Sequence, residues 1–261
     1  MKWLGHGVCG SKKNCGMRNS PKRFLQRIWD LYAGAATIAS IAKRRCNKCL
    51  IRGRNHCVAS MVEDIFAELL VVTMGKGAHD VVVLVDCPVY AGRFYRKRRK
   101  TIYPDIVVCI RLGEKELRVV HMYELKVNTG WMRKGSAECF NKMVRSWKKM
   151  SQYASVKIDG KHSKLIFPDD VKYDLVIVSS VSNEEGKALS QVTKIRSKKD
   201  VRFGGWILSD CELNSKYVKN PVIGRKELKP REDFSEMLEI LAKEVDDIHG
   251  KSQAKQVPDW N

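Results

Sequence analysis

Two apolar runs on either side of a short turn constrain the fold of this chain more than any other feature of its sequence. The runs are IVVCIRL at residues 106–112 and LRVVHMYELKV at residues 117–127, with the turn GEKE at residues 113–116 between them. Apolar segments of this length are typical of strands, and a short connection that contains glycine is typical of a hairpin. The sequence therefore predicts an antiparallel pair of strands near the middle of the chain.

The segments on either side of this hairpin alternate between helical and strand-like patterns, which predicts an α/β fold. An amphipathic helix is expected to begin near Ala59, and a polar helix is expected at residues 136–154. Further strands are expected at residues 81–85, 173–181 and 205–208. Because YDLVIVSSV at residues 173–181 is continuously apolar, we expect it to be central in a sheet that is covered on both faces. Further helices are expected at residues 23–44, 184–196 and 233–249.

A chain of 261 residues is long enough for one sizeable core with an appendage. Residues 1–57 hold five of the nine cysteines and many basic residues, so we expect them to form a helical N-terminal appendage. Residues 58–215 would form the core. Residues 216–261 would add a C-terminal helix, with Phe234, Met237, Leu238, Leu241, Val245 and Ile248 on its apolar face, and a flexible tail from Gly250.

The charge of the chain favours a polyanionic partner. Lysine and arginine number 49 against 29 acidic residues, which gives a formal net charge of +20. Nucleic acid is the first expectation and an anionic membrane surface the second, because clustered cationic side chains displace counterions from phosphates. The densest cluster comprises Arg93, Arg96, Lys97, Arg98, Arg99 and Lys100. No stretch approaches the roughly 20 apolar residues of a transmembrane helix, and we expect a cytoplasmic protein that does not enter membranes.

Three polar residues converge in the predicted hairpin. The two-residue period of a strand puts Glu124 and Lys126 on one face, and the start of one strand of a hairpin, Asp105, lies beside the end of the next. Two converging carboxylates repel each other unless a cation lies between them, and hard oxygen ligands suit Mg²⁺. The expected ligands are Asp105, Glu124, the Leu125 carbonyl and water. Such a site suits phosphodiester hydrolysis, with Lys126 orienting the attacking water or helping to deprotonate it.

These residues resemble the signature of the PD-(D/E)xK, or restriction-endonuclease-like, superfamily: Pro104-Asp105, eighteen intervening residues, and then Glu124-Leu125-Lys126. The expected element order over residues 58–181 also matches the core of that superfamily, αβββαβ. The resemblance implies a mixed central sheet flanked by helices and a Mg²⁺-dependent DNA endonuclease in which Mn²⁺ substitutes for Mg²⁺. The preference for DNA over RNA rests on the resemblance alone.

Members of the superfamily often supply a further acid from the first helix, where this sequence has Glu63, Asp64 and Glu68. At about 100° per residue, Glu63 lies about 20° beyond one edge of the apolar stripe and Glu68 about 60° beyond the other edge. Glu63 is therefore the predicted additional catalytic acid and metal ligand. In the superfamily the helix after the signature flanks the active site, so Arg145 and Lys149 are expected to contact DNA.

The cysteines near the N-terminus allow a zinc site. Cys46 and Cys49 have the C-x-x-C spacing of a zinc knuckle, and four ligands would be completed by His56 with Cys57 or by the distant pair Cys9 and Cys15. Free thiols are the alternative. Cys87, Cys109, Cys139 and Cys211 are expected to be small buried hydrophobic residues. The helix at residues 31–45 is expected to pack against the core, with a DNA-recognition helix as the alternative.

Several functions remain open at this stage. A junction resolvase or an exonuclease is compatible with the same signature. A non-catalytic nucleic-acid-binding protein on this scaffold is a rival from another class, as is an RNA-binding or ribosome-associated basic protein, although neither needs paired acids. A homodimer is one expectation for the oligomeric state.

Overall fold

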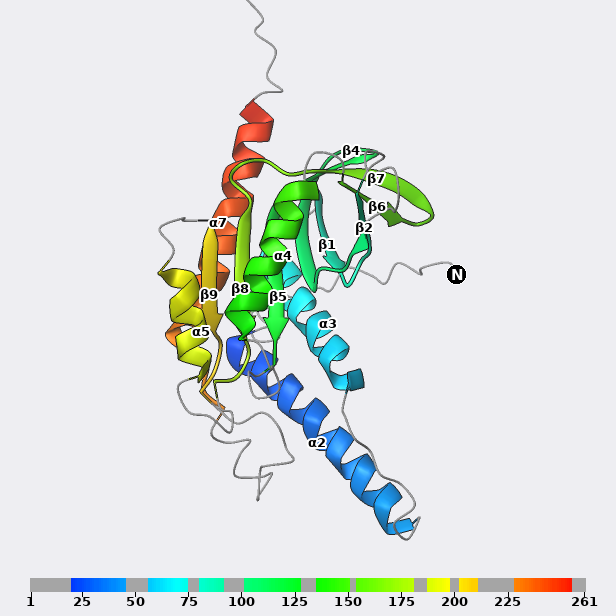
Figure 1. The fold of residues 1–261 in the computed structure, drawn as a ribbon, viewed down its shortest axis with the longest axis vertical. Helices are drawn as coiled ribbons and strands as arrows, with labels where there is room; N and C mark the ends of the chain where they lie inside the picture. Colours follow the sequence, from blue (N-terminus) through cyan, green and yellow to red (C-terminus); the bar gives the residue numbers. More distant parts are fainter. Residues whose placement is uncertain are drawn as a thin grey trace, which may run out of the picture.

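The computed structural model describes residues 20–45, 56–74, 80–91, 101–127, 135–150, 154–180, 187–197, 202–210 and 228–254. Within these residues the chain is an α/β protein with five helices around a mixed sheet of nine strands (Figure 1). The helices are α2 (Pro21–Arg45), α3 (His56–Thr73), α4 (Ser136–Met150), α5 (Lys187–Arg196) and α7 (Glu232–Ala254). The strands are β1 (Val81–Val85), β2 (Val89–Ala91), β3 (Thr101–Ile102), β4 (Ile106–Gly113), β5 (Glu116–Lys126), β6 (Ala154–Ile158), β7 (Lys161–Ile166), β8 (Lys172–Ile177) and β9 (Phe203–Ile207).

The hairpin of β4 and β5 is the centre of the sheet. The two strands are antiparallel, with a register that runs from Ile106 opposite Tyr123 to Gly113 opposite Glu116, so the predicted hairpin is confirmed. β1 pairs with β4 in the antiparallel sense, whereas β8 runs parallel to β5, and β9 runs parallel to β8. The sheet is therefore mixed, with the crossover helix α4 between β5 and β8.

A second group of strands extends from the beginning of β5. Residues 116–118 of β5 pair in parallel with β7, which pairs with β6, and β2 connects β6 to β3. We call β2, β3, β6 and β7 the β arm. None of these four strands was predicted from the sequence, and the helix predicted at residues 136–154 is too long, because α4 ends at Met150 and β6 begins at Ala154. Asp159 and Gly160, both with positive φ, form the tight turn between β6 and β7.

Hydrophobic cores cover both faces of the sheet. On one face, α2, α3 and α7 pack together, and Phe24 contacts Phe66 and Phe234 edge to face at ring-centroid distances of 5.7 Å and 5.4 Å. On the other face, α4 and α5 pack on the sheet with Phe140 and Trp147 fully buried. Residues of β8 alternate between the two cores, which confirms the prediction of a central strand covered on both faces.

The two terminal helices contribute to the first of these cores. Five residues near the start of α2, which belongs to the predicted N-terminal appendage, are buried there: Phe24, Leu25, Ile28, Trp29 and Tyr32. The predicted apolar face of α7 is also confirmed, since Phe234, Met237, Leu238, Leu241 and Val245 are buried and Ile248 is half-buried. The helix continues to Ala254, so the flexible tail predicted from Gly250 does not begin there.

A helix that crosses a membrane has to be both long and apolar. Among the described residues, none of the helices combines the length and the apolar character needed to cross a membrane.

The packing of Phe24 predicts that α2 is part of the folding unit. Replacement of Phe24, which is 3% exposed, by alanine should lower the free energy of unfolding by about 3–5 kcal/mol, the usual effect of emptying an aromatic core position. Urea denaturation measures the change. Lys22→Ala, at an exposed position on the first turn of the same helix, should change the free energy by less than about 0.5 kcal/mol. A Phe24→Ala variant as stable as the wild type would show that α2 is an independent appendage.

Candidate active site

Three carboxylates form a row across one end of the sheet. Asp86 follows β1, Asp105 precedes β4, and Glu124 is near the end of β5. Val85 is opposite Ile106, and Ile106 is opposite Tyr123, so the register makes Asp105 the neighbour of both other acids. The backbone N–H of Asp86 donates a hydrogen bond to the Asp105 carbonyl at 2.9 Å. We call Asp86, Asp105 and Glu124 the acid row.

The strand alternation sets the direction of two of these acids. Val107 and Met122, two residues along β4 and β5 from Asp105 and Glu124, are buried in the core beneath α4. Because residues two apart share a face of a strand, Asp105 and Glu124 lie on that same side of the sheet, beyond the edge of its apolar packing. Side-chain exposure is 21% for Asp105 and 14% for Glu124, so water reaches both carboxylates.

Lys126 binds both carboxylates. Its Nζ forms an ion pair with Glu124 Oε1 and lies 3.3 Å from Asp105 Oδ2. The same Asp105 oxygen accepts a hydrogen bond of 2.7 Å from the backbone N–H of Leu125. The structure thus brings together Asp105, Glu124 and Lys126, as the hairpin register predicted.

The charges at this site shift one another's titration. Burial raises the pKa of Glu124, and the charge of Asp105 adds to the increase, while Lys126 opposes it. Burial alone would lower the pKa of Lys126, but the charges of Glu124 and Asp105 outweigh burial and raise it. Lys126 is therefore a protonated ammonium at neutral pH. A protonated ammonium can donate a hydrogen bond to a water molecule, but it cannot accept a proton from one.

Glu63 faces the acid row from α3. Burial, followed by the charges of Asp105 and Asp86, raises the pKa of Glu63 from 4.5 to about 7. The other two acids of this helix are exposed, and Glu68 is engaged with Arg27 in an ion pair of 2.7 Å. Of the three acids that the sequence offered, Glu63 is therefore the one whose half-buried carboxyl interacts with Asp105.

The donor set fits a hard divalent cation. Asp105 and Glu124 supply carboxylate oxygens, which Mg²⁺ prefers. The pKa values of Glu63 and Glu124 are raised first by burial and then by neighbouring negative charge, which a cation would offset. The N–H of Leu125 points at Asp105, and the N–H and C=O of a strand residue point to the same side, which directs the Leu125 carbonyl toward the acid row. Within the described ranges, however, no group of three His, Cys, Asp or Glu residues is assembled to hold a metal ion. The Lys126 ammonium instead binds the two carboxylates.

Several predicted site residues lie outside the described residues or are described only in part. The basic run Arg93, Arg96, Lys97, Arg98, Arg99 and Lys100 lies outside them, in the segment between β2 and β3. Cys9, Cys46 and Cys49 also lie outside, and Cys57 is in α3 without a described side chain, so the zinc site stays a prediction. Arg145 is exposed on α4, and the Lys149 side chain, further along α4, is not described.

The cysteines of the sheet and of α4 were predicted less accurately. Cys109 is buried as expected, with the pKa of its thiol raised to about 12, first by burial and then by Cys87. Cys87 and Cys139 are half-buried, so the prediction that they are buried was wrong. Cys87 follows the end of β1, and Cys139 is in the first turn of α4, where the packing is incomplete. Cys211 lies outside the described residues.

Asp86 was missed by sequence reasoning. A signal was present, because this aspartate directly follows the apolar run VVVLV just as Asp105 directly precedes IVVCI. Only the antiparallel pairing of β1 with β4 makes the two positions adjacent, and that pairing joins residues about twenty positions apart.

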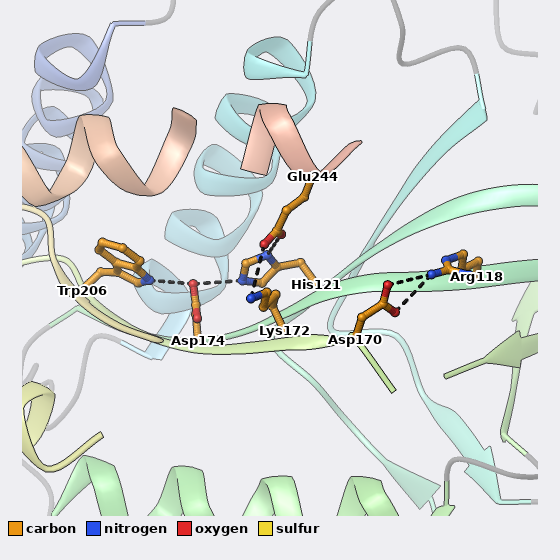
Figure 2. Close-up of polar contacts among 7 residues, drawn as sticks. All are labelled: Arg118, His121, Asp170, Lys172, Asp174, Trp206 and Glu244. Atoms are coloured by element: carbon orange, nitrogen blue, oxygen red, sulfur yellow. Dashed lines mark hydrogen bonds and ion pairs between the residues drawn. The ribbon is translucent and has the colours of Figure 1, made fainter. Parts of the chain in front are cut away.

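A second polar cluster holds β5 in place three residues before Glu124 (Figure 2). His121, 2% exposed, lies between Asp174 of β8 and Glu244 of α7, with Nε2 2.9 Å from Asp174 Oδ2 and Nδ1 3.2 Å from Glu244 Oε2. The Asp174 contact has the distance of an ion pair but not the direction of a hydrogen bond. Trp206 of β9 donates its indole N–H to the same Asp174 oxygen at 2.6 Å. Lys172 of β8 lies 3.8 Å from Glu244.

This cluster joins elements that are far apart in the sequence. The His121 ring stacks on Tyr123 at 4.2 Å, and Tyr123 packs edge to face on Phe66 of α3. Nearer the start of β5, Arg118 binds both carboxylate oxygens of Asp170 at 3.0 Å and 3.1 Å (Figure 2). The strand that carries Glu124 and Lys126 is thus fixed to β8, β9, α3 and α7, which holds the acids in register.

Comparison with known proteins identifies no relative. No family model matches this chain, no curated protein matches it, and no solved structure matches it.

The His121 cluster predicts that stability falls at alkaline pH. Burial would lower the pKa of His121, but Asp174 and Glu244 outweigh burial and raise it from 6.5 to about 9. The folded state therefore holds this proton more tightly than the unfolded chain. The stabilisation is complete below about pH 6.5 and is lost as the pH rises through about 9. The free energy of unfolding, measured with urea, should fall by about 2 kcal/mol between pH 7 and 9.5.

Two variants of α7 test this assignment. Glu244→Gln removes one of the charges that hold the proton on His121, so the decline should become shallower. Glu239→Gln, at an exposed position of the same helix, should retain the wild-type dependence. A wild-type protein whose stability does not change between pH 7 and 9.5 would contradict the assignment.

Proposed function

We propose that this protein is a metal-dependent DNA nuclease that hydrolyses phosphodiester bonds at the acid row. The observation that carries the proposal is the convergence of Asp105, Glu124 and Lys126 at one end of the sheet, with Glu63 facing them from α3. Partly buried acids that repel one another destabilise a fold, and perturbed carboxyl pKa values of this kind gather at functional sites.

The architecture supports the resemblance to the PD-(D/E)xK superfamily. In chain order, α3, β1, β4, β5, α4 and β8 have the sequence αβββαβ, with the hairpins β2–β3 and β6–β7 as insertions. The strand directions also agree with a mixed core, since β1, β4 and β5 are antiparallel neighbours and β8 is parallel to β5. On this proposal the signature residues lie at the centre of a restriction-endonuclease-like core.

Asp105 and Glu124, with the Leu125 carbonyl and Glu63, are the residues that would hold Mg²⁺. A bound Mg²⁺ supplies charge stabilisation at a phosphoryl oxygen and lowers the pKa of a coordinated water. Asp105 is already oriented for this role by the N–H of Leu125, and Glu124 by its ion pair with Lys126. The Lys126 ammonium would move from between the carboxylates toward the phosphate that enters.

Lys126 and Glu63 have distinct roles in this proposal. Lys126 keeps its proton, so it attracts the phosphate and orients the attacking water by donating a hydrogen bond. Glu63, whose pKa is about 7 while no cation lies among the acids, would give up its proton as Mg²⁺ binds and serve as a ligand.

DNA is the proposed substrate because the chain carries a net charge of +20 and the resemblance is to DNA nucleases. Arg145, exposed on α4, and the basic run from Arg93 to Lys100 are the proposed phosphate contacts. A resolvase or an exonuclease would use the same chemistry on a different DNA structure. A non-catalytic DNA-binding protein would need the basic residues but not the acid row.

Substitution of the acids tests the proposal. Asp105→Asn and Glu124→Gln each remove a charge and retain an oxygen that accepts the existing hydrogen bonds, so the fold should persist. Each variant should lose Mg²⁺-dependent nicking of supercoiled plasmid DNA, whereas Lys126→Ala should lower the rate by about 10²-fold, as is typical for a lost acid–base group. Gel quantification with Mg²⁺, with Mn²⁺ and without metal gives the rates.

Glu68→Gln is the matched control. It changes an exposed acid of α3 that pairs with Arg27 and not with the acid row, so it should cut at the wild-type rate. Cleavage by Asp105→Asn or Glu124→Gln at the wild-type rate would overturn the proposed active site.

A further inference from the structure

The β2–β3 hairpin of the β arm begins and ends beside the acid row. Asp86 lies three residues before β2, and Asp105 lies three residues after β3. The backbones of Asp86 and Asp105 are hydrogen-bonded to each other. The chain therefore enters and leaves the β2–β3 hairpin at neighbouring positions beside the acid row. At about 3.3–3.6 Å per extended residue, Tyr90 and Thr101 are within about 14 Å of the backbone of these acids. Anything bound to this hairpin is therefore close to the candidate active site.

One face of the β arm is turned toward solvent. Val89, Val156 and Leu165 are buried in the core beneath α4, so the alternate residues of the same strands point the other way. The register aligns Tyr90 with Ser155, Ser155 with Lys164, and Lys157 with His162. We call the outward side of these four strands the outer face: Tyr90, Thr101, Ser155, Lys157, His162 and Lys164.

Two rings and two lysines occupy the outer face. The rings of Tyr90 and His162 lie 5.8 Å apart at an angle of 62°, which shows that they project on the same side. His162, Lys157 and Lys164 are exposed, and Tyr90 is half-buried. The face therefore combines aromatic surface with positive charge.

A third ring lies between the outer face and the acids. Tyr103 follows β3 and stands two residues before Asp105. At 63% exposure it is the most exposed large hydrophobic side chain among the residues that the structure describes. Burial of such a ring against a partner would remove apolar surface from water, and its position is on the path from the β arm to Asp105.

The charge of the β arm matches a polyanion. Its β6–β7 hairpin has three exposed lysines, Lys157, Lys161 and Lys164, and one acidic residue, Asp159, in its turn. Glu116 of the neighbouring strand β5 pairs with Lys164 at 3.3 Å. The sequence that joins β2 to β3, GRFYRKRRK at residues 92–100, contains six basic residues and no acidic one. Both hairpins of the arm are therefore net positive.

We propose that the outer face and Tyr103 bind single-stranded DNA, so that the strand passes over the end of the sheet to the acid row, whose Asp105 and Glu124 carboxylates lie on the opposite side. Unpaired bases expose their faces and stack on aromatic side chains, while lysines alongside contact the phosphates. In a duplex the bases already stack on one another, so a duplex would engage the lysines and leave Tyr90, Tyr103 and His162 without a role. The inference deepens the proposed function and rests on it, because it takes the acid row as the end of the strand's path.

Binding measured without catalysis tests the inference. Fluorescence anisotropy with a labelled, unstructured oligodeoxynucleotide in EDTA gives the affinity for single strands, and the same sequence as a duplex is the comparison. His162→Ala, Tyr103→Ala and Tyr90→Leu should each weaken single-strand binding by about 5- to 100-fold, the usual effect of losing one stacked base. Duplex affinity should change by less than about twofold, since stacking on a duplex is not available.

Controls separate stacking from folding and from charge. Tyr90→Phe keeps the ring and should bind single strands like the wild type. Lys243→Ala, at an exposed position of α7, removes one lysine away from the arm and should bind both DNA forms nearly as the wild type does. His162 and Tyr103 are exposed, so their variants remain informative even if Tyr90→Leu does not fold.

The outcomes distinguish the inference from the proposed nuclease. Selective loss of single-strand affinity in the ring variants supports the inference. If the wild-type protein also fails to cleave DNA with Mg²⁺, only the nuclease proposal is contradicted. Unchanged single-strand affinity in all three ring variants overturns the inference. An equal loss of affinity for single strands and for duplexes also overturns the inference. The absence of single-strand binding by the wild-type protein does the same, whether or not the protein cleaves DNA.

Discussion

The carboxylates at one end of the sheet repel one another, and the surrounding structure has to hold them together. Strand register places Asp86, Asp105 and Glu124 next to one another, and α3 adds Glu63. Asp105, Glu124 and Glu63 are partly buried, so their charges are weakly screened, and the pKa of Glu63 rises to about 7 as a result of burial and of its acidic neighbours. Lys126 offsets part of this repulsion by pairing with both Asp105 and Glu124.

The packing of the sheet holds these acids together against their repulsion. β5 lies between β4 and β8, with hydrophobic cores on both faces. The buried His121 cluster connects this strand to α7, β8 and β9 at a point three residues before Glu124. Gly204 of β9 belongs to this arrangement, since a Cβ there would lie 2.2 Å from Asp174 Oδ1. Rigid surroundings of this kind are what a metal-binding or catalytic site requires, because its ligands must keep their geometry.

The parts of this arrangement that could be predicted depend on local periodicity. The β4–β5 hairpin follows from two apolar runs around a glycine turn, and its register brings Asp105 to Glu124. Glu63 follows from its angle on an amphipathic helix. Asp86 and the His121 cluster could not be predicted, because they need pairings across the sheet and a contact between residues 123 positions apart. The β arm was missed because Lys157, Lys161 and Lys164 interrupt its apolar pattern and β3 has only two residues. The burial of Phe24 against Phe234 is also non-local.

On the proposed function, Asp105, Glu124 and Glu63 bind a divalent cation in place of the Lys126 ammonium. Isothermal titration calorimetry of the wild-type protein with Mn²⁺ at pH 7, repeated in two buffers of different ionisation enthalpy, tests it most directly. With a pKa of about 7, Glu63 is protonated in about half of the molecules at this pH. We expect saturable binding that releases about half a proton per ion, and Asp105→Asn should lose the binding. Binding of Mn²⁺ that is unaffected by Asp105→Asn, or no binding at millimolar Mn²⁺, would contradict it.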